Sequence, residues 1–191
     1  MPEQPVLKIG AVIVRERDGA VLIMQPIPKR TGETTLYVLP RGSRQYSVER
    51  NGNTEWHDAR DAATGTEHAA TLEPFRRTLE REIEEEAGIT PEQLKKAHVV
   101  EMGAMDFKSR TKGIYPIHWF IVVPDEATAT AISRTTPVEA LSTRWAKFDA
   151  IIKLDNVGKF STGYIPVIEA ALKLTRSTPG QSPRGAVARE R

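Results

Sequence analysis

The sequence of 191 residues contains no cysteine. This absence excludes disulfide bonds, thiol nucleophiles and zinc sites built from thiolates, and it fits a reducing compartment, so we expect a cytoplasmic protein. The sequence also has no apolar run as long as a membrane span, and its N-terminal stretch lacks the apolar core of a signal peptide. We therefore expect no association with a membrane.

An excess of charge of one sign is missing as well. Lysine and arginine number 27 and aspartate and glutamate 25, which gives a formal net charge of +2. A protein that binds duplex nucleic acid usually carries a basic excess, so we expect no such partner. The hydrophobic content of 39% is enough for one substantial core. We expect a single domain over residues 1–174 and a disordered basic tail over 175–191, which is rich in Ser, Pro, Gly and Arg.

The most informative segment that is present is REIEEEAGI, from Arg81 to Ile89. At about 100° per residue, a helix brings Glu82, Glu85 and Glu86 within one third of its circumference, and Glu86 points toward the apolar stripe. Like charges at this spacing repel, and acids are unfavourable near a helix C-terminus. These penalties reverse when a divalent ion binds, and oxygen ligands in this number suit Mg²⁺ or Mn²⁺. The alternative is an acidic helix end that only faces solvent.

The same segment contains a stop signal for the helix. Gly88 suits the left-handed position that follows a helix, and Ile89 can make the hydrophobic contact of a Schellman cap. We therefore expect the helix to end just before Gly88.

These residues resemble the second half of the Nudix box, whose pattern is Arg-Glu, an apolar residue, any residue, two Glu, any residue, Gly and an apolar residue. The matching positions are Arg81, Glu82, Ile83, Glu85, Glu86, Gly88 and Ile89. Glu73 lies at an earlier glutamate of the pattern, but Glu67 replaces the glycine expected six positions before it. The pattern is restored if Gly42, in the stretch LPRG, is the box glycine and an insertion of about 25 residues, within 43–70, separates it from the helix.

The resemblance implies a fold and a reaction. The fold would be a Nudix-like α/β/α sandwich of the α/β (α+β) class, with a mixed β-sheet and the box helix beside it. The reaction would be Mg²⁺-dependent hydrolysis of a nucleoside diphosphate linked to another group X, in nucleotide derivatives or in dinucleoside and other polyphosphates. Such a hydrolase acts on phosphoric anhydride bonds of a small phosphorylated molecule. The alternative is a catalytically silent Nudix module that binds a nucleotide to regulate or scaffold a partner.

The resemblance also implies roles for individual residues. The metal ligands would be Glu82, Glu85, Glu86 and the Gly42 carbonyl, and the catalytic group would comprise Glu82, Glu85 and Arg81, which orients the carboxylates. The general base is the least defined role. Glu82 is the first candidate, and Asp125 or Glu126 is the second, although this acidic pair also fits a solvated turn.

Substrate contacts are predicted less sharply. Arg41 and Arg44 follow the Leu-Pro step and could hold phosphates through paired hydrogen bonds, although arginines in a loop also serve solubility. Ala104 and Met105 occupy the positions where relatives that cleave ADP-ribose or dinucleoside polyphosphates have proline or tyrosine. Their presence weakens both substrate assignments, so LPRG is the remaining hint, and it favours dinucleoside or inositol polyphosphates.

The hydrophobic pattern predicts the order of the elements. Strands are expected at 6–14, 20–25, 36–39, 98–107, 114–123 and 143–148, and helices after Thr71, after Thr90 and at 164–174. The strand at 114–123 is nearly all apolar and should be central in the sheet. Within the insertion, Asn51 and Gly52 predict a type I′ hairpin turn, followed by a mobile segment near Gly65. The insertion could be a lid over the substrate, a surface elaboration or the contact of a homodimer.

Overall fold

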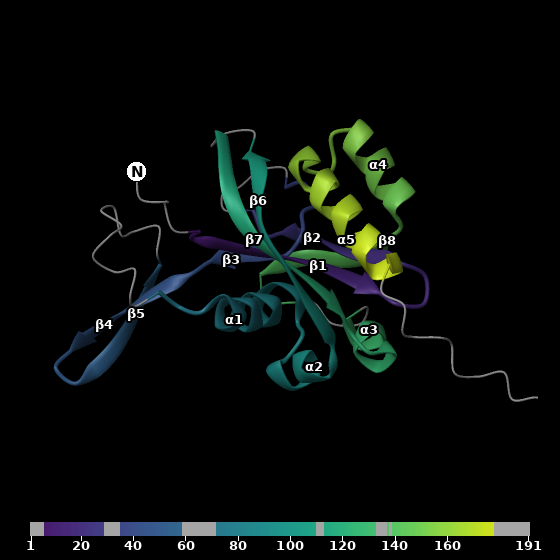
Figure 1. The fold of residues 1–191 in the computed structure, drawn as a ribbon. Coiled ribbons are helices and arrows are strands. Elements are labelled where there is room, and N and C mark those ends of the chain that lie inside the picture. The colour runs from purple at the N-terminus through teal and green to yellow at the C-terminus, as the bar shows by residue number, and fades with distance from the viewer. Residues whose placement is uncertain are drawn as a thin grey trace, which may run out of the picture.

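The computed structural model describes residues 6–28, 35–58, 72–109, 113–132, 137 and 139–177. Its central feature is a twisted mixed sheet with helices on both faces (Figure 1). The strands follow each other in space as β6-β7-β1-β2-β8, and β3 pairs with β1 beside this path. Only β1 and β7 run parallel to each other, while the other pairs are antiparallel. The predicted mixed sheet is therefore confirmed.

The strands of this sheet agree with most of the predicted ranges. They are β1 Lys8–Arg15, β2 Ala20–Pro26, β3 Arg41–Ser43, β6 His98–Ser109, β7 Gly113–Val123 and β8 Ala140–Ala146. β7 lies inside the sheet between β6 and β1, and six consecutive residues from Ile117 to Val122 are buried. Its apolar run is explained by burial on both faces, as the sequence predicted.

Each face of the sheet has its own hydrophobic core. On one face, Ile9, Ile13 and Phe120 pack with residues of α1 (Phe75–Ala87) and α2 (Pro91–Lys96). On the other face, Val12, Trp119 and Ile121 pack with α5 (Ile165–Ser177), which is preceded by the 3₁₀ turn Thr162–Tyr164. Two more helices, α3 (Glu126–Ile132) and α4 (Phe148–Asn156), complete the order. Alternate residues of β1 and β7 thus serve different cores, as the two-residue period of a strand requires.

The helix that carries the acidic segment ends as predicted. Gly88 adopts the left-handed conformation, with φ 69° and ψ 25°, and its N–H donates to the Glu84 carbonyl at 3.1 Å. The Ile89 N–H donates to the Ile83 carbonyl, and Ile89 is fully buried, which completes a Schellman cap. The predicted capping box of α2 is also present, because the Thr90 side chain accepts from the Gln93 N–H and the Gln93 side chain from the Thr90 N–H.

The start of α1 differs from the prediction. The helix begins at Phe75 with Pro74 at the N-cap, whereas Leu72 forms a bridge to Tyr46 and Thr71 lies outside the described residues. The helix expected directly after Thr71 therefore starts later, because Leu72 pairs with Tyr46 of the insertion. Pro74 accounts for the boundary, since it lacks an N–H and fits only the start of a helix.

The insertion contains the predicted hairpin. Its strands are β4 Gln45–Arg50 and β5 Asn53–Asp58, joined by Asn51 and Gly52 with φ of 52° and 78°. The pair projects from the body of the molecule (Figure 1). The hairpin contacts α1 through Trp56 of β5, because the Arg77 guanidinium lies 4.4 Å from the Trp56 ring centroid. The segment near Gly65 lies outside the described residues, and the roles as lid or dimer contact stay predictions.

Other boundaries differ for identifiable reasons. The strand predicted at 36–39 is wrong, because Tyr37 and Val38 make only single bridges and the strand that pairs with β1 is Arg41–Ser43. Phe148 starts α4 instead of ending the last strand, and α3 and α4 were not predicted. α5 continues to Ser177, three residues beyond the predicted helix end, and residues 178–191 lie outside the described part. No helix in the described ranges is long and apolar enough to cross a membrane.

Candidate active site

Gly42 lies directly against the carboxylate of Glu82. β3 pairs with β1 through Ile9 and Gly42, and this places the Gly42 backbone under α1. A Cβ atom at residue 42 would lie 1.6 Å from the Cδ atom of Glu82, so only glycine permits this approach. The structure therefore brings LPRG and the acidic segment together, although some 40 residues separate them. This contact is what the assignment of Gly42 as the box glycine requires.

The neighbouring residue of β3 contacts Glu86. The backbone N–H of Arg41 donates to Oε2 of Glu86 at 2.6 Å. The pKa of Glu86 is raised to about 8, chiefly by burial; the nearby carboxylates of Glu82 and Glu139 contribute to the rise, and the Arg41 N–H opposes it. Burial also raises the pKa of Glu82, although the Arg81 guanidinium opposes this shift. A buried carboxylate, Glu82, and a half-buried one, Glu86, therefore face the backbone of one short strand.

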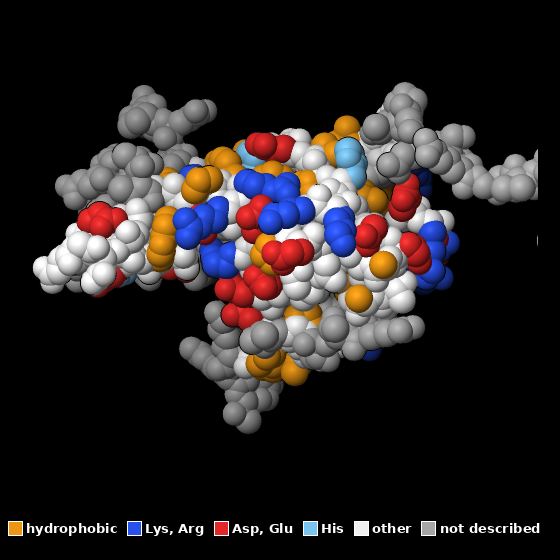
Figure 2. Space-filling model, turned by 90° about the horizontal axis from the view of Figure 1, so that it is seen from below, with side chains coloured by type: hydrophobic (Ala, Val, Ile, Leu, Met, Phe, Trp, Pro, Cys, Tyr) orange, Lys and Arg blue, Asp and Glu red, His pale blue; other side chains and the backbone are white. Residues whose placement is uncertain are grey.

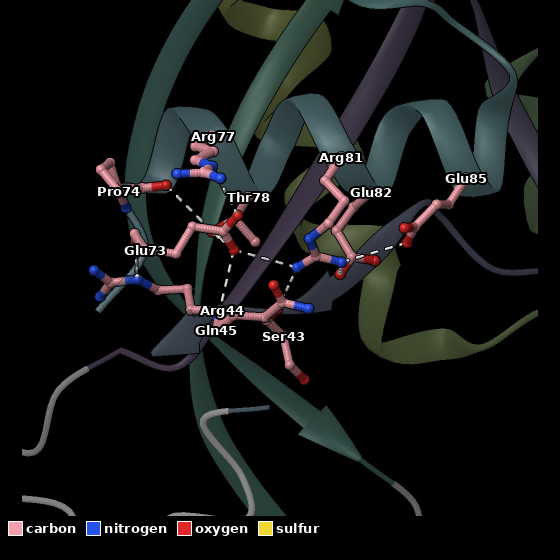
Figure 3. A network of polar contacts seen from close by, with 10 residues as sticks. All are labelled: Ser43, Arg44, Gln45, Glu73, Pro74, Arg77, Thr78, Arg81, Glu82 and Glu85. Carbon is pink, nitrogen blue, oxygen red and sulfur yellow. Dashed lines mark hydrogen bonds and ion pairs between the residues drawn. The ribbon is translucent and has the colours of Figure 1, made fainter. Parts of the chain in front are cut away.

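Arg81 links the acidic side chains, as Figure 3 shows. Its Nη1 donates to Glu82 Oε1 at 2.6 Å and to Glu85 Oε2 at 3.3 Å. Its Nη2 donates to the Ser43 carbonyl at 2.8 Å and to Glu73 Oε2 at 3.3 Å. A guanidinium that contacts three carboxylates and β3 fixes their orientation, which matches the role expected for Arg81.

Glu73 anchors this network at the start of α1. Its side chain is only 2% exposed and accepts hydrogen bonds from Thr78 Oγ1 at 3.0 Å and from the Gln45 N–H at 3.3 Å (Figure 3). Because Gln45 begins β4, one buried carboxylate connects the helix, the guanidinium of Arg81 and the inserted hairpin. The glutamate that the pattern placed before the acidic segment thus has a structural task.

Glu139 is a further carboxylate of the site, and no sequence pattern indicated it. It lies just before β8, and its N–H donates to the Glu85 carbonyl at 3.3 Å. Its carboxylate contributes to the raised pKa of both Glu82 and Glu86, so it lies in their neighbourhood. A single glutamate in a loop has no pattern, and only the pairing of β8 with β2 brings it to α1.

The two predicted substrate arginines lie in different places. Arg41 is beside Glu86, and its Nη1 donates to the Tyr115 hydroxyl at 3.0 Å. Arg44 lies at the start of α1, where its Nε donates to the Glu73 carbonyl at 2.8 Å and its Nη1 to the Val6 carbonyl at 3.1 Å. The Arg44 guanidinium also packs 4.2 Å from the Phe75 ring centroid. The structure therefore brings Arg41, and not Arg44, to the buried carboxylates.

Asp125 and Glu126 are separated from this site. Gly42 and His118 both pair with Ile9, so His118 marks the level of the site on β7. Asp125 lies seven residues beyond His118 along the chain, roughly 20 Å away at about 3.3 Å per residue. Asp125 accepts from the Thr128 N–H at 2.7 Å as the cap of α3, and Glu126 pairs with Arg17 at 2.8 Å. The alternative base predicted from the sequence therefore stands at the other end of β7, where both acids have structural partners.

The donor set fits a hard divalent cation. Among the described residues no three acidic or histidine side chains converge at metal-binding distance, because Glu82 is turned to Arg81 and Glu86 to the Arg41 N–H. The ligands available are carboxylates and a backbone carbonyl, which are oxygen donors of the kind that Mg²⁺ prefers. Buried carboxylates with raised pKa values need either protons or a cation to remain where they are. The surrounding surface is mixed, since basic and acidic side chains are interspersed on the face of α1 that Figure 2 shows.

Substitution of Gly42 by alanine should displace Glu82. The added Cβ would occupy the position of the carboxyl group, so the Glu82 side chain must move away from β3. We expect affinity for Mg²⁺ or Mn²⁺ to fall at least about tenfold, the scale of losses when the support of a metal ligand is removed. Isothermal titration calorimetry measures this. Binding as in the unmodified protein would contradict the contact.

Glu86 should make the stability of the metal-free protein depend on pH. Its pKa is about 8 in the folded state, above the usual value of 4.5, so the folded protein holds the proton more tightly than the unfolded chain. The resulting contribution to the free energy of unfolding is fully present below about pH 4.5. It falls by a few kcal/mol as the pH rises to about 8. Urea unfolding in the presence of a chelator, at several pH values, should show this decline, and Glu86→Gln should flatten it. Equal slopes for both proteins would contradict the burial of an unpaired carboxylate.

Comparisons of sequence find no relative. No protein-family model matches the chain, and no curated protein matches it. Comparisons of structure, in contrast, find Nudix proteins. A NUDIX hydrolase from Nitrosomonas europaea has a TM-score of 0.52 and 16% sequence identity, over 89% of this chain and 89% of that chain. The dihydroneopterin triphosphate pyrophosphohydrolase of E. coli has a TM-score of 0.52 and 14% identity, over 89% of this chain and 99% of its own.

A third neighbour is known in complexes with ADP ribose and with DNA. The NUDIX domain of Shewanella oneidensis NrtR, in complex with ADP ribose, has a TM-score of 0.50 and 14% identity, over 92% of this chain and 90% of that chain. Longer NrtR, in complex with a 27mer DNA, has a TM-score of 0.52 and 14% identity, and the match covers 90% of this chain and 63% of that one. Identities this low establish the architecture alone. By its strand order, its two helical layers and these neighbours, the chain has the fold of the Nudix hydrolases.

Proposed function

We propose that the protein is a Mg²⁺-dependent pyrophosphohydrolase that cleaves a nucleoside diphosphate linked to another group X. One observation carries this proposal: on a Nudix fold, the buried carboxylate of Glu82 and the half-buried carboxylate of Glu86 face the backbone of Gly42 and Arg41. A purely structural helix would not gain from carboxylates that are buried and mutually repelling, because desolvation alone raises their pKa values.

The proposed metal ligands are Glu82, Glu85, Glu86 and the Gly42 carbonyl. A Mg²⁺ or Mn²⁺ ion bound there would neutralise charge on the diphosphate and lower the pKa of an attacking water. Arg81 holds Glu82 and Glu85 through its Nη1, and Glu73 holds Arg81 in turn. The protein's own contribution is therefore a set of oxygen atoms fixed before the substrate arrives, which lowers the cost of reorganisation in the reaction.

Two carboxylates are candidates for the general base. Glu82 remains the first, since it lies at the centre of the site, but Arg81 donates to it at 2.6 Å and makes it a weaker base. Glu139 replaces Asp125 and Glu126 as the second candidate. It is exposed, so it can pass a proton to solvent, and it faces the buried pair.

Arg41 is the proposed phosphate contact. Its guanidinium donates to the Tyr115 hydroxyl and its charge opposes the rise that burial causes in the pKa of Glu86, whereas the guanidinium of Arg44 is engaged by backbone carbonyls at the start of α1. A site for a divalent ion with a nearby arginine suits a phosphorylated small molecule as substrate. In that substrate, the group X can be a nucleoside, a sugar or further phosphate. We expect the protein to work in the cytoplasm, on this substrate instead of on duplex nucleic acid.

The second candidate function is a nucleotide-binding regulatory module. The likeness to NrtR favours it, because that neighbour shares the fold and is a DNA complex in one structure. The enzyme is the stronger proposal because the acidic side chains Glu82, Glu85 and Glu86 are all retained and a fourth, Glu139, joins them. A module that only binds a ligand would be more stable without them.

Glu86→Gln should abolish most of the turnover. Loss of a charged ligand at the site should lower the rate at least about a hundredfold, while the metal-free fold stays intact. The matched control is Glu84→Gln, which changes an exposed glutamate of the same helix and should leave the rate unchanged. The assay measures products from a panel of nucleoside diphosphate derivatives, dinucleoside polyphosphates and nucleoside triphosphates, with Mg²⁺ and with chelator. Absence of metal-dependent turnover on every compound would favour the regulatory module.

Glu139→Gln tests the choice of general base. If Glu139 accepts the proton from water, the variant should lose about two to four orders of magnitude in kcat and the acidic limb of its pH–rate profile. Its affinity for Mn²⁺ should stay within a few-fold of the unmodified value, because Glu82 and Glu86 remain. A near-normal kcat would leave the role to Glu82.

A further inference from the structure

The side chain of Arg41 is fixed on the sheet face that carries α5. Its Nη1 donates to the Tyr115 hydroxyl at 3.0 Å, and its Cζ atom lies 5.1 Å from the Phe107 ring centroid and 5.5 Å from that of Tyr164. These three aromatic residues belong to the α5 side of the core or pack against it. One hydrogen bond and two rings therefore define where the guanidinium lies.

The backbone of the same residue serves the other side of the sheet. Its N–H donates to Glu86 at 2.6 Å, a short distance that is typical of a charged acceptor. Arg41 thus connects a carboxylate under α1 with a hydroxyl on β7.

The ladder at this point is short, and two hydrogen bonds extend it: the Pro40 carbonyl accepts from the Ala11 N–H at 2.9 Å, and the Arg44 N–H donates to the Leu7 carbonyl at 2.9 Å. β3 has three residues and pairs with β1 alone, and Gly10, which is opposite Arg41, has no side chain to pack against it. Pro40, which precedes Arg41, has no N–H to donate. A fixed side chain at Arg41 therefore adds a constraint that the short ladder lacks.

We propose that Arg41 and Tyr115 are positioning residues for Glu86. The hydrogen bond from the Arg41 guanidinium to the Tyr115 hydroxyl holds the Arg41 backbone in place, so that its N–H keeps the Glu86 carboxylate oriented to bind a divalent cation. Groups that orient a metal ligand control affinity for the ion without touching it. This inference rests on the proposed function, since it takes Glu86 as a metal ligand.

The role differs from the phosphate contact expected of the LPRG stretch. A phosphate contact acts only when substrate is bound, and its loss raises KM. The positioning role acts in the free protein and changes affinity for the ion before any substrate is present. Binding of the ion alone therefore separates the two roles.

Two tyrosine-to-phenylalanine variants make a matched pair. Tyr115→Phe removes the acceptor of the Arg41 hydrogen bond, whereas Tyr164→Phe removes a buried hydroxyl that has no hydrogen-bond partner in the described part of the chain. Both variants keep the aromatic ring beside Arg41. In calorimetric titration with Mn²⁺ and without substrate, Tyr115→Phe should lose affinity about tenfold, the lower end of what such support contributes, and Tyr164→Phe less than about twofold.

Arg41→Ala tests the same chain from its other end. The variant retains the backbone N–H, so any loss of Mn²⁺ affinity comes from the side chain. It should lose at least as much as Tyr115→Phe, and the double variant Arg41→Ala with Tyr115→Phe should lose no more than Arg41→Ala alone. Additive losses would mean that the two residues act separately and would overturn the inference.

The Arg41 amide proton gives a readout that needs neither metal nor turnover. A short hydrogen bond to a carboxylate moves its NMR resonance downfield, and Glu86→Gln identifies that contribution. Tyr115→Phe should move the resonance part of the way toward the Glu86→Gln position, while Tyr164→Phe should not.

Three further results would overturn the inference. The first is unchanged Mn²⁺ binding together with an unmoved Arg41 amide resonance in Tyr115→Phe. The second is an equal loss of Mn²⁺ affinity in Tyr115→Phe and Tyr164→Phe. The third is a rise in KM in Tyr115→Phe with no change in its Mn²⁺ affinity. If the unmodified protein binds no divalent ion, the proposed function fails, and the amide resonance still decides whether Tyr115 positions the contact with Glu86.

Discussion

The arrangement of the whole site depends on the close contact between α1 and the backbone of β3. Glu82 can lie over Gly42 only because residue 42 has no Cβ, and the half-buried Glu86 accepts a hydrogen bond from the Arg41 N–H. The fold makes this approach possible through the core between α1 and β1, where Leu79 and Ile83 are fully buried. Burial then converts ordinary glutamates into groups whose charge is costly, and this cost is the physical basis of a preference for a cation.

The network around Arg81 limits that cost without cancelling it. Arg81 pairs with Glu73, Glu82 and Glu85, and Arg77 lies 3.8 Å from Glu73, so one guanidinium faces both Glu82 and Glu85. The Arg81 guanidinium also donates to the Ser43 carbonyl, which holds it in place. Its main effect is therefore to orient the carboxylates, and it neutralises their charge only in part. The hairpin insertion joins the same network through Gln45 and Glu73, so the chain accommodates the extra residues without disturbing the helix.

Much of this could be predicted where the determinants are local. Gly88 and Ile89 end α1, Thr90 and Gln93 start α2, and Asn51 with Gly52 turns the hairpin, because each signal acts within a few residues. The carboxylate patch followed from helical periodicity, and the contact of Gly42 followed from the family resemblance. Non-local features were missed. The position of β3 depends on its pairing with β1. Glu139 comes close to the site because β8 pairs with β2. The distance of Asp125 from the site depends on the length of β7.

The central claim is that the buried carboxylates exchange a proton for a divalent cation. Calorimetric titration with Mg²⁺ at about pH 7, repeated in buffers of different ionisation enthalpy, measures both the binding and the protons released. Because the pKa of Glu86 is about 8, the metal-free site should hold a proton at that pH, and binding should release on the order of one proton per ion. The same release should be absent in Glu86→Gln. A protein that binds no Mg²⁺, or that binds it without releasing a proton, would contradict the account.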